Sequence, residues 1–249
     1  MSLKTCFKKY LSDHFNPAQR KKIQRFLVNC RALGHGHDLT KLAQIFGTDK
    51  WGEHHYTPHY QNHFNRFKNK PIKLLEIGVG GDETPNVGGN SLRMWKKYFP
   101  HGQIFSLDIY DKSALSEKRI TIFQGDQNDP ALLKKIYQTI GELNLIIDDG
   151  SHVNEHRLTS FQTLFPLLKD GGIYIMEDLQ TSYWPKFNGD SENLNNPANT
   201  TTFLKQLTDG LNYREIDSPN YTPDYFAQNI TSIHFYHNLV FIYKGKNID

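Results

Sequence analysis

The chain has 249 residues, a formal net charge of +3 and 37% hydrophobic residues. This length suits one large α/β domain or a domain with a small appendage. Both signs of charge are mixed along the chain, so charge indicates neither a nucleic acid nor a membrane surface as a partner. The longest apolar runs have the length of a strand and are far too short to span a bilayer.

Residues 1–70 have the texture of a helical cap rich in His, Lys and aromatic residues. No apolar stretch follows the early lysines, which argues against a signal peptide. Cys6 and Cys30 form no metal or redox motif, so we expect a cytoplasmic, reducing environment. Pro17 and Asp38 are suited to helix starts, and Gly47 to a helix end. The helices expected here cover 17–33, 39–46 and 58–68.

From Pro71 onward, strand and helix signals alternate, which predicts an open, mostly parallel sheet with helices on both faces. We therefore expect two parts, a helical cap over 1–70 and an α/β domain over 71–249. The expected strands are 72–78, 103–109, 120–124, 143–148 and 172–177, and the expected helices are 91–98, 130–140 and 154–168.

The C-terminal part departs from this alternation. The polar segment from Gln180 to Pro197 is long enough to be a functional lid. A helix is expected over 200–211, followed by two strands around a tight turn at His237-Asn238. A terminal antiparallel hairpin on a parallel sheet is typical of Rossmann-like S-adenosylmethionine-dependent methyltransferases.

The first strand leads into a glycine-rich turn, Glu76-Ile77-Gly78-Val79-Gly80. Glycine lets the backbone turn sharply and approach a ligand, so Gly78 is a candidate cofactor contact. The spacing is not the dinucleotide fingerprint, because its third glycine is missing. The acid two residues before Gly78 is typical of the methyltransferase version, although ordinary turns also contain Gly-x-Gly.

Acidic residues also end the next three strands. Asp108 suits a hydrogen bond to a ribose diol, Asp126 could accept from an adenine amino group, and Asp148 is expected on the cofactor side. A single aspartate at a strand end is more often a helix cap or turn residue. Acids at successive strand ends favour a cofactor site.

Two further motifs predict metal chemistry. Asp148-Asp149-Gly150-Ser151-His152 follows one strand and Glu177-Asp178 follows the next. On neighbouring strands, these carboxylates would form a site for a hard divalent cation, with a base beside it. The alternative is that each pair caps the segment after it. A non-heme iron site that uses His152 with carboxylates is a further alternative.

Four histidines lie close together in the sequence, at positions 54, 55, 59 and 63. His59 and His63 are one helical turn apart, as zinc ligands often are. Tyr60 stands where a protease would need its catalytic glutamate, so a helix that covers the cofactor pocket is the preferred interpretation.

Together, five segments resemble the metal-dependent sugar O-methyltransferases of macrolide antibiotic pathways, the mycinamicin enzymes among them. The resemblance begins near residue 40, and the segments are Gly47-Thr48-Asp49-Lys50, Tyr56-Thr57-Pro58-His59-Tyr60, Gly89-Asn90-Ser91-Leu92-Arg93-Met94-Trp95, Asp148-Asp149-Gly150-Ser151-His152 and Glu177-Asp178. It implies that Asp149, Glu177 and Asp178 bind Mg²⁺ and that His152 is the general base. It also implies an S-adenosylmethionine site lined by Thr48, Glu76, Ser91, Asp108 and Asp126.

The resemblance implies methylation of a sugar hydroxyl in a glycosylated small molecule, by an enzyme that forms homo-oligomers. The alternative acceptor is a catechol or another non-sugar vicinal diol. The mycinamicin enzyme has a large extra N-terminal domain that this sequence does not contain, and that domain bears on assembly and acceptor.

Overall fold

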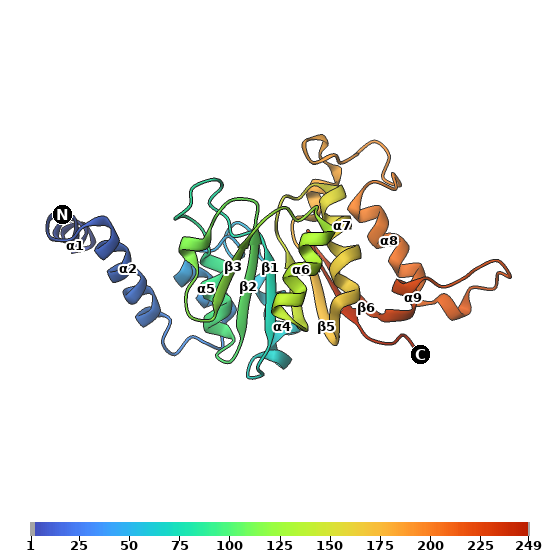
Figure 1. The fold of residues 1–249 in the computed structure, drawn as a ribbon, viewed down its shortest axis with the longest axis horizontal. Helices are drawn as coiled ribbons and strands as arrows, with labels where there is room; N and C mark the ends of the chain where they lie inside the picture. Colours follow the sequence, from blue (N-terminus) through green and yellow to red (C-terminus); the bar gives the residue numbers. More distant parts are fainter. Residues whose placement is uncertain (1–2, 249) are drawn as a thin grey trace. The chain divides into compact units, whose positions relative to one another are not determined.

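The computed structural model describes residues 3–248, and Figure 1 shows its ribbon. The chain separates into two compact units, Met1–Arg66 and Phe67–Asp249, and the first two residues and the last lie outside the described part. In the described part, no helix is both long and apolar enough to cross a membrane. The boundary expected at residues 70 and 71 stays a prediction.

The first unit consists of helices whose ends follow their capping residues. The helices are α1 (Leu3–His14), α2 (Pro17–Arg31), α3 (Leu39–Phe46) and α4 (Thr57–Phe64), followed by the 3-10 turn η1 (Asn65–Phe67). Asn16 and Gln19 form a capping box before α2, and Asp38 accepts a hydrogen bond from the backbone of Lys41. Gly47 ends α3 with φ of 70°. The sequence predicted three of these helices within a few residues and did not single out α1.

The second unit contains a seven-stranded sheet in the order β3-β2-β1-β4-β5-β7-β6. The first five strands are parallel neighbours, whereas β7 is antiparallel to both β5 and β6. The strands are β1 (Lys73–Ile77), β2 (Gln103–Asp108), β3 (Ile120–Gln124), β4 (Leu143–Asp148), β5 (Leu168–Met176), β6 (Ile230–Tyr236) and β7 (Leu239–Lys244). The predicted parallel sheet with a C-terminal antiparallel hairpin is therefore confirmed.

Helices follow the strands in the predicted alternation. They are α5 (Asn90–Tyr98), α6 (Pro130–Ile140), α7 (Asn154–Leu164), α8 (Thr200–Leu211) and α9 (Tyr225–Asn229), with 3-10 turns η2 (Ser113–Leu115), η3 (Phe165–Leu167), η4 (Leu179–Tyr183), η5 (Pro185–Phe187) and η6 (Tyr213–Glu215). The helix expected over 154–168 ends at Leu164, because Pro166 disfavours its continuation. β5 then begins at Leu168, four residues before its predicted start.

Alternation along the strands divides the core into two faces. Ile146 and Tyr174 share an apolar cluster with residues of α6, α7 and α8, such as Ile136, Phe161 and Leu204. Glu76 lies between Leu75 and Ile77, so it points to the opposite face, where the indole of Trp95 on α5 reaches it. Glu76 is therefore on the face of the sheet opposite to this apolar cluster.

The segment expected as a lid contains η4 and η5 and then a series of turns. Asn154 fastens it at two points, because its side chain donates to Phe187 O at 3.1 Å and accepts from Thr200 N at 2.7 Å. Asp190 binds further backbone amides within the segment. A lid function stays a prediction.

Candidate metal and cofactor site

Two loops at the carboxyl end of the sheet bring Asp178 and Glu177 each close to Asp149, in two different groupings. Asp148 and Met176 are partners in neighbouring parallel strands, so the residues that follow β4 and β5 leave the sheet side by side. One oxygen or nitrogen from each of Asp149, His152 and Asp178 lies within 4.8 Å of the others. A second grouping within the same limit joins Glu76, Asp149 and Glu177.

The donor atoms of these groupings fit a hard divalent cation. Four of the five side chains offer carboxylate oxygens, which Mg²⁺ prefers. Asp149 belongs to both groupings, so it is the residue around which the cluster is built. His152 and Asp178 keep 23% and 17% of their side chains exposed, which leaves the cluster accessible to a ligand.

Backbone geometry argues against the capping interpretation of these residues. α7 has Val153 as its N-cap and no side-chain cap, and η4 begins after Asp178 without a side-chain cap. His152 and Asp178 instead adopt left-handed backbone conformations, with φ of 60° and 53°. Such conformations are costly for residues other than glycine and concentrate at functional sites. Both strained residues belong to the same cluster.

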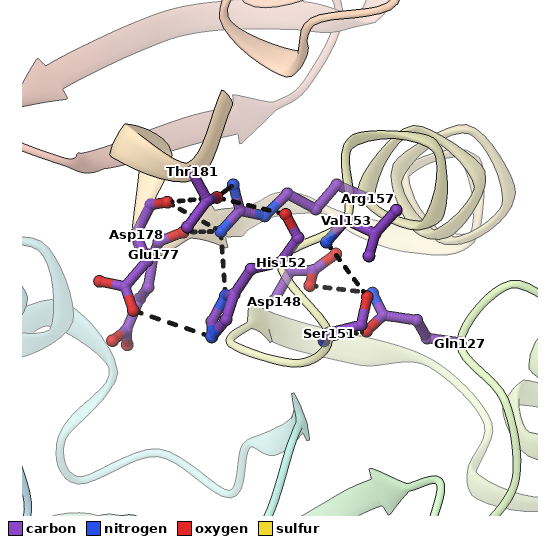
Figure 2. Close-up of polar contacts among 9 residues, drawn as sticks. All are labelled: Gln127, Asp148, Ser151, His152, Val153, Arg157, Glu177, Asp178 and Thr181. Atoms are coloured by element: carbon purple, nitrogen blue, oxygen red, sulfur yellow. Dashed lines mark hydrogen bonds and ion pairs between the residues drawn. The ribbon is translucent and has the colours of Figure 1, made fainter. Parts of the chain in front are cut away.

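Arg157 on α7 joins the two loops, as Figure 2 shows. Its Nη1 donates to Thr181 Oγ1 at 2.8 Å, and its Nη2 donates to Glu177 O at 2.6 Å and to Asp178 O at 3.0 Å. Nη2 also lies 3.0 Å from Nδ1 of His152. Because arginine has no lone pair to accept with, Nδ1 is the acceptor and a neutral imidazole carries its proton on Nε2. Nε2 faces Asp178 Oδ2 at 3.8 Å.

Asp148 was predicted on the cofactor side, and its cofactor role stays a prediction. Its side chain is fully buried on the α6–α7 face, and it accepts from Gln127 Nε2 at 3.2 Å and from the Tyr174 hydroxyl at 3.1 Å. Burial raises the pKa of the Asp148 carboxyl to about 6, although the Arg157 charge and both hydrogen bonds oppose this shift. The sequence placed the residue at the correct strand end, but strand alternation turns its side chain into the core.

Gln127 connects the buried Asp148 to the loop that follows β4 and carries His152. Its Nε2 donates to Asp148, and its Oε1 accepts from the backbone of Ser151 at 2.7 Å (Figure 2). Asp148 and Gln127 therefore hold the start of the loop that carries His152.

The first strand supplies a second buried acid, at the predicted cofactor site. Glu76 is fully buried, and its Oε2 accepts from Ser91 Oγ at 3.0 Å and from Trp95 Nε1 at 3.1 Å. The structure therefore brings together Glu76 and Ser91, both predicted to line the cofactor site. Glu76 also belongs to a cluster of acids with Asp149 and Glu177, so it lies between the two candidate sites.

The glycine turn after β1 lies against both Asp108 and the loop that follows β4. Asp108 accepts from Val79 N and from Tyr110 N, both at 2.9 Å, and so fixes the turn. Gly78 has φ of +99°, and a Cβ there would lie 2.1 Å from the carbonyl oxygen of Asp149. This close approach is the reason for glycine at position 78.

The two remaining cofactor candidates are less constrained. Asp126 is exposed after β3, and its Oδ1 accepts from Asn128 N at 2.8 Å, which is a turn contact. Thr48 follows α3 in the first unit, where its hydroxyl donates to Asp49 at 3.2 Å. The cofactor roles of both residues stay predictions.

Several residues that organise the site were not predicted from the sequence: Trp95, Lys112, Gln127, Arg157, Tyr174 and Thr181. Lys112, for example, is fully buried and donates to the carbonyls of Gly81, Thr84 and Val87 at 2.8–3.2 Å. Apart from Trp95, which ends the segment 89–95, none of these residues belongs to a segment singled out in the sequence. Only a polar side chain within an apolar helix face, such as Arg157 beside Phe161, could have drawn attention to them.

The N-terminal histidines form no metal site among the described residues, because both metal groupings lie around Asp149. Burial lowers the pKa of His59. Trp51 and His55 pack edge to face, and His54 stacks on Tyr56. The role of α4 as a cover of the cofactor pocket stays a prediction.

No family model matches the chain. Among curated proteins it is 46% identical to the mycinamicin VI 2''-O-methyltransferase of Micromonospora griseorubida, over 84% of this chain and 53% of that protein. It is 44% identical to the 8-demethyl-8-alpha-L-rhamnosyl tetracenomycin-C 2'-O-methyltransferase of Streptomyces olivaceus, over 87% of this chain and 58% of that protein. The chain thus spans just over half the length of these relatives.

A solved structure gives the same result for the fold. The MycE methyltransferase from the mycinamycin biosynthetic pathway, in complex with Mg, SAH and mycinamycin VI, superposes with a TM-score of 0.82 at 45% identity. The match covers 85% of this chain and 54% of that one. The grouping of Asp149, His152 and Asp178 resembles the ligand set of the iron oxygenase alternative. The likenesses to known proteins favour the methyltransferase hypothesis over that alternative.

Proposed function

The chain is a homologue of the sugar O-methyltransferases of macrolide and tetracenomycin pathways, and on this basis we propose that it transfers a methyl group from S-adenosylmethionine to a sugar hydroxyl in a Mg²⁺-dependent reaction. The observation that carries the proposal is the acidic cluster around Asp149, which lies beside Glu76 at the end of β1. The acceptor is a glycosylated small molecule, and a catechol or other non-sugar diol is the alternative.

The cofactor would lie at the carboxyl ends of β1 and β2. Gly78 lets the glycine turn approach the backbone of Asp149 closely, and Asp108 ends β2 with a carboxylate suited to the two hydroxyls of a ribose. Glu76 and Ser91 are already connected by a hydrogen bond at the inner side of this region. Asp126 and Thr48 complete the proposed set.

The metal would be held by Asp149, Glu177 and Asp178, whose carboxylate oxygens fit Mg²⁺. When bound, the ion supplies Lewis-acid polarisation and a fixed orientation for adjacent sugar hydroxyls. The anionic cluster also suits the positive sulfonium of the methyl donor, because opposite charges attract most strongly in a partly buried site.

His152 is the proposed acceptor of the hydroxyl proton. Its ring adjoins Asp178 and keeps part of its surface exposed. To accept at Nε2, the ring has to move its own proton to Nδ1 and give up the contact with Arg157. Arg157 Nη2 can release it, because its two hydrogens already have the carbonyls of Glu177 and Asp178 within 3.0 Å.

The test is methyl transfer from labelled S-adenosylmethionine to a panel of deoxysugar glycosides and catechols, with Mg²⁺ and with EDTA. We expect sugar methylation that EDTA abolishes. His152→Ala is expected to lower kcat by about 10²–10⁴-fold, the contribution of a placed general base. His101→Ala, an exposed histidine at the opposite end of the sheet, is the matched control.

Three results would contradict the proposal: turnover that is indifferent to EDTA, a near-normal rate in folded His152→Ala, or transfer to catechols alone.

A further inference from the structure

Arg157 is an arginine with no exposed surface, placed one turn into α7 behind the acidic cluster. A guanidinium is expensive to remove from water, so its bonds inside the protein have to replace those of the solvent. They go to backbone carbonyls, a hydroxyl and an imidazole, all of them in the two loops that follow β4 and β5. The guanidinium of Arg157 therefore connects the loop that follows β4 to the loop that follows β5.

Thr181 completes the connection. Its hydroxyl accepts a hydrogen bond from Arg157 Nη1. The same hydroxyl lies 2.8 Å from Asp178 O, to which it donates, and 3.2 Å from His152 O. These two carbonyls belong to His152 and Asp178, the two residues of the acidic cluster that have left-handed backbone. The Arg157–Thr181 clamp thus binds both strained turns at once (Figure 2).

We propose that the Arg157–Thr181 clamp is a positioning device that holds His152 and the Glu177-Asp178 pair in register for metal binding and methyl transfer. This inference rests on the proposed function. The two clamp side chains act through the backbone carbonyls of His152, Glu177 and Asp178.

Loss of the clamp is expected to affect the candidate metal site and the candidate cofactor site differently. The acids are placed by the loops that the clamp joins, so its loss moves the metal ligands relative to one another. The cofactor contacts at Glu76, Ser91 and Asp108 are held by α5 and the glycine turn, which the clamp does not reach. Metal affinity and kcat should therefore fall while S-adenosylhomocysteine binding persists.

The variants are Arg157→Lys, which keeps the charge but cannot span the same acceptors, and Thr181→Val, which removes the hydroxyl at nearly constant volume. Thr181→Ser keeps the hydroxyl and should restore wild-type behaviour. The matched control is Arg119→Lys. Arg119 also donates to three carbonyls, those of Lys96, Phe99 and Gly102, but it lies beside the amino end of β3.

Mn²⁺ alone is titrated into the cofactor-free full chain, and the free ion is measured by electron paramagnetic resonance. Arg157→Lys and Thr181→Val should bind Mn²⁺ about 10–100-fold more weakly, as expected when groups that orient metal ligands are lost. The kcat should fall by a similar factor while the KM for S-adenosylmethionine changes little. Thr181→Ser and Arg119→Lys should match the wild type.

The proposed role of the clamp is refuted if folded Arg157→Lys and Thr181→Val have the Mn²⁺ affinity and kcat of the wild type. It is also refuted if Arg119→Lys loses as much Mn²⁺ affinity and kcat as these two variants. If Arg157→Lys does not fold, the comparison of Thr181→Val with Thr181→Ser decides. A wild-type chain that binds Mn²⁺ but transfers no methyl group contradicts the proposed function, and the Mn²⁺ comparison still tests the clamp.

Discussion

Replacement of Asp148 by Asn should make the protein more stable at neutral pH. Burial raises the pKa of the Asp148 carboxyl from 3.8 to about 6, so the folded state binds this proton more tightly than the unfolded state. The stability that the proton contributes is complete at low pH and is lost as pH rises through the folded pKa. Asparagine keeps the shape and can still accept from Gln127, but it carries no charge to bury.

The size of the effect follows from the shift. About two pKa units correspond to roughly 3 kcal/mol of unfolding free energy, lost between pH values near 4 and 7. The difference between Asp148→Asn and the wild type should grow by this amount across that range. Urea unfolding at a series of pH values measures it, in EDTA and without cofactor so that the adjacent Asp149 binds nothing. Asp170→Asn, with the same charge change on the surface, should run parallel to the wild type. Parallel curves for Asp148→Asn and the wild type would refute the reasoning.

Two further substitutions test the geometry of the cofactor region. Gly78→Ala should destabilise the fold and weaken S-adenosylhomocysteine binding, because its Cβ would lie 2.1 Å from Asp149 O. Gly80→Ala has no atom within 4 Å of its Cβ, so it should lower the unfolding free energy only by the roughly 1–2 kcal/mol of a left-handed residue. Thermal unfolding and calorimetry separate the two, and equal losses would contradict the clash. Trp95→Phe removes one donor from the buried Glu76 carboxylate, at a cost of about 1–3 kcal/mol, and should lower S-adenosylhomocysteine affinity. Unchanged stability and affinity would exclude that role for the indole.

The fold was largely predictable from the sequence because its signals are local. Strand-length apolar runs, capping residues such as Asp38 and the glycine turn at Gly78 each act within a few residues. The helix over 154–168 was extended too far because the apolar pattern continues through Phe165 and Leu167, although Pro166 ends it. The short helix α9 carries little periodic signal in its five residues.

The candidate site was predictable only in part, for a different reason. Asp149, His152, Glu177 and Asp178 directly follow strands, so their convergence follows from the order of the sheet. The side chains that hold them come from helices and turns whose spatial relation is set by the whole fold. Arg157 reaches Thr181 across 24 positions of sequence, and Gln127 reaches Asp148 across 21. The internal contacts of Asp148 have the same origin, because Gln127 and Tyr174 lie 21 and 26 positions away from it in the sequence.

The antiparallel hairpin also determines when the sheet becomes complete during synthesis. β7 pairs with β5 along residues 173–176, which are fully buried in the finished protein. Until residues 239–244 have left the ribosome, this apolar strand presents an open edge to other chains. The chain therefore passes through an aggregation-prone stage after the loops that follow β4 and β5 have been made. Chaperone capture of a nascent chain would be most useful between the emergence of β5 and that of β7.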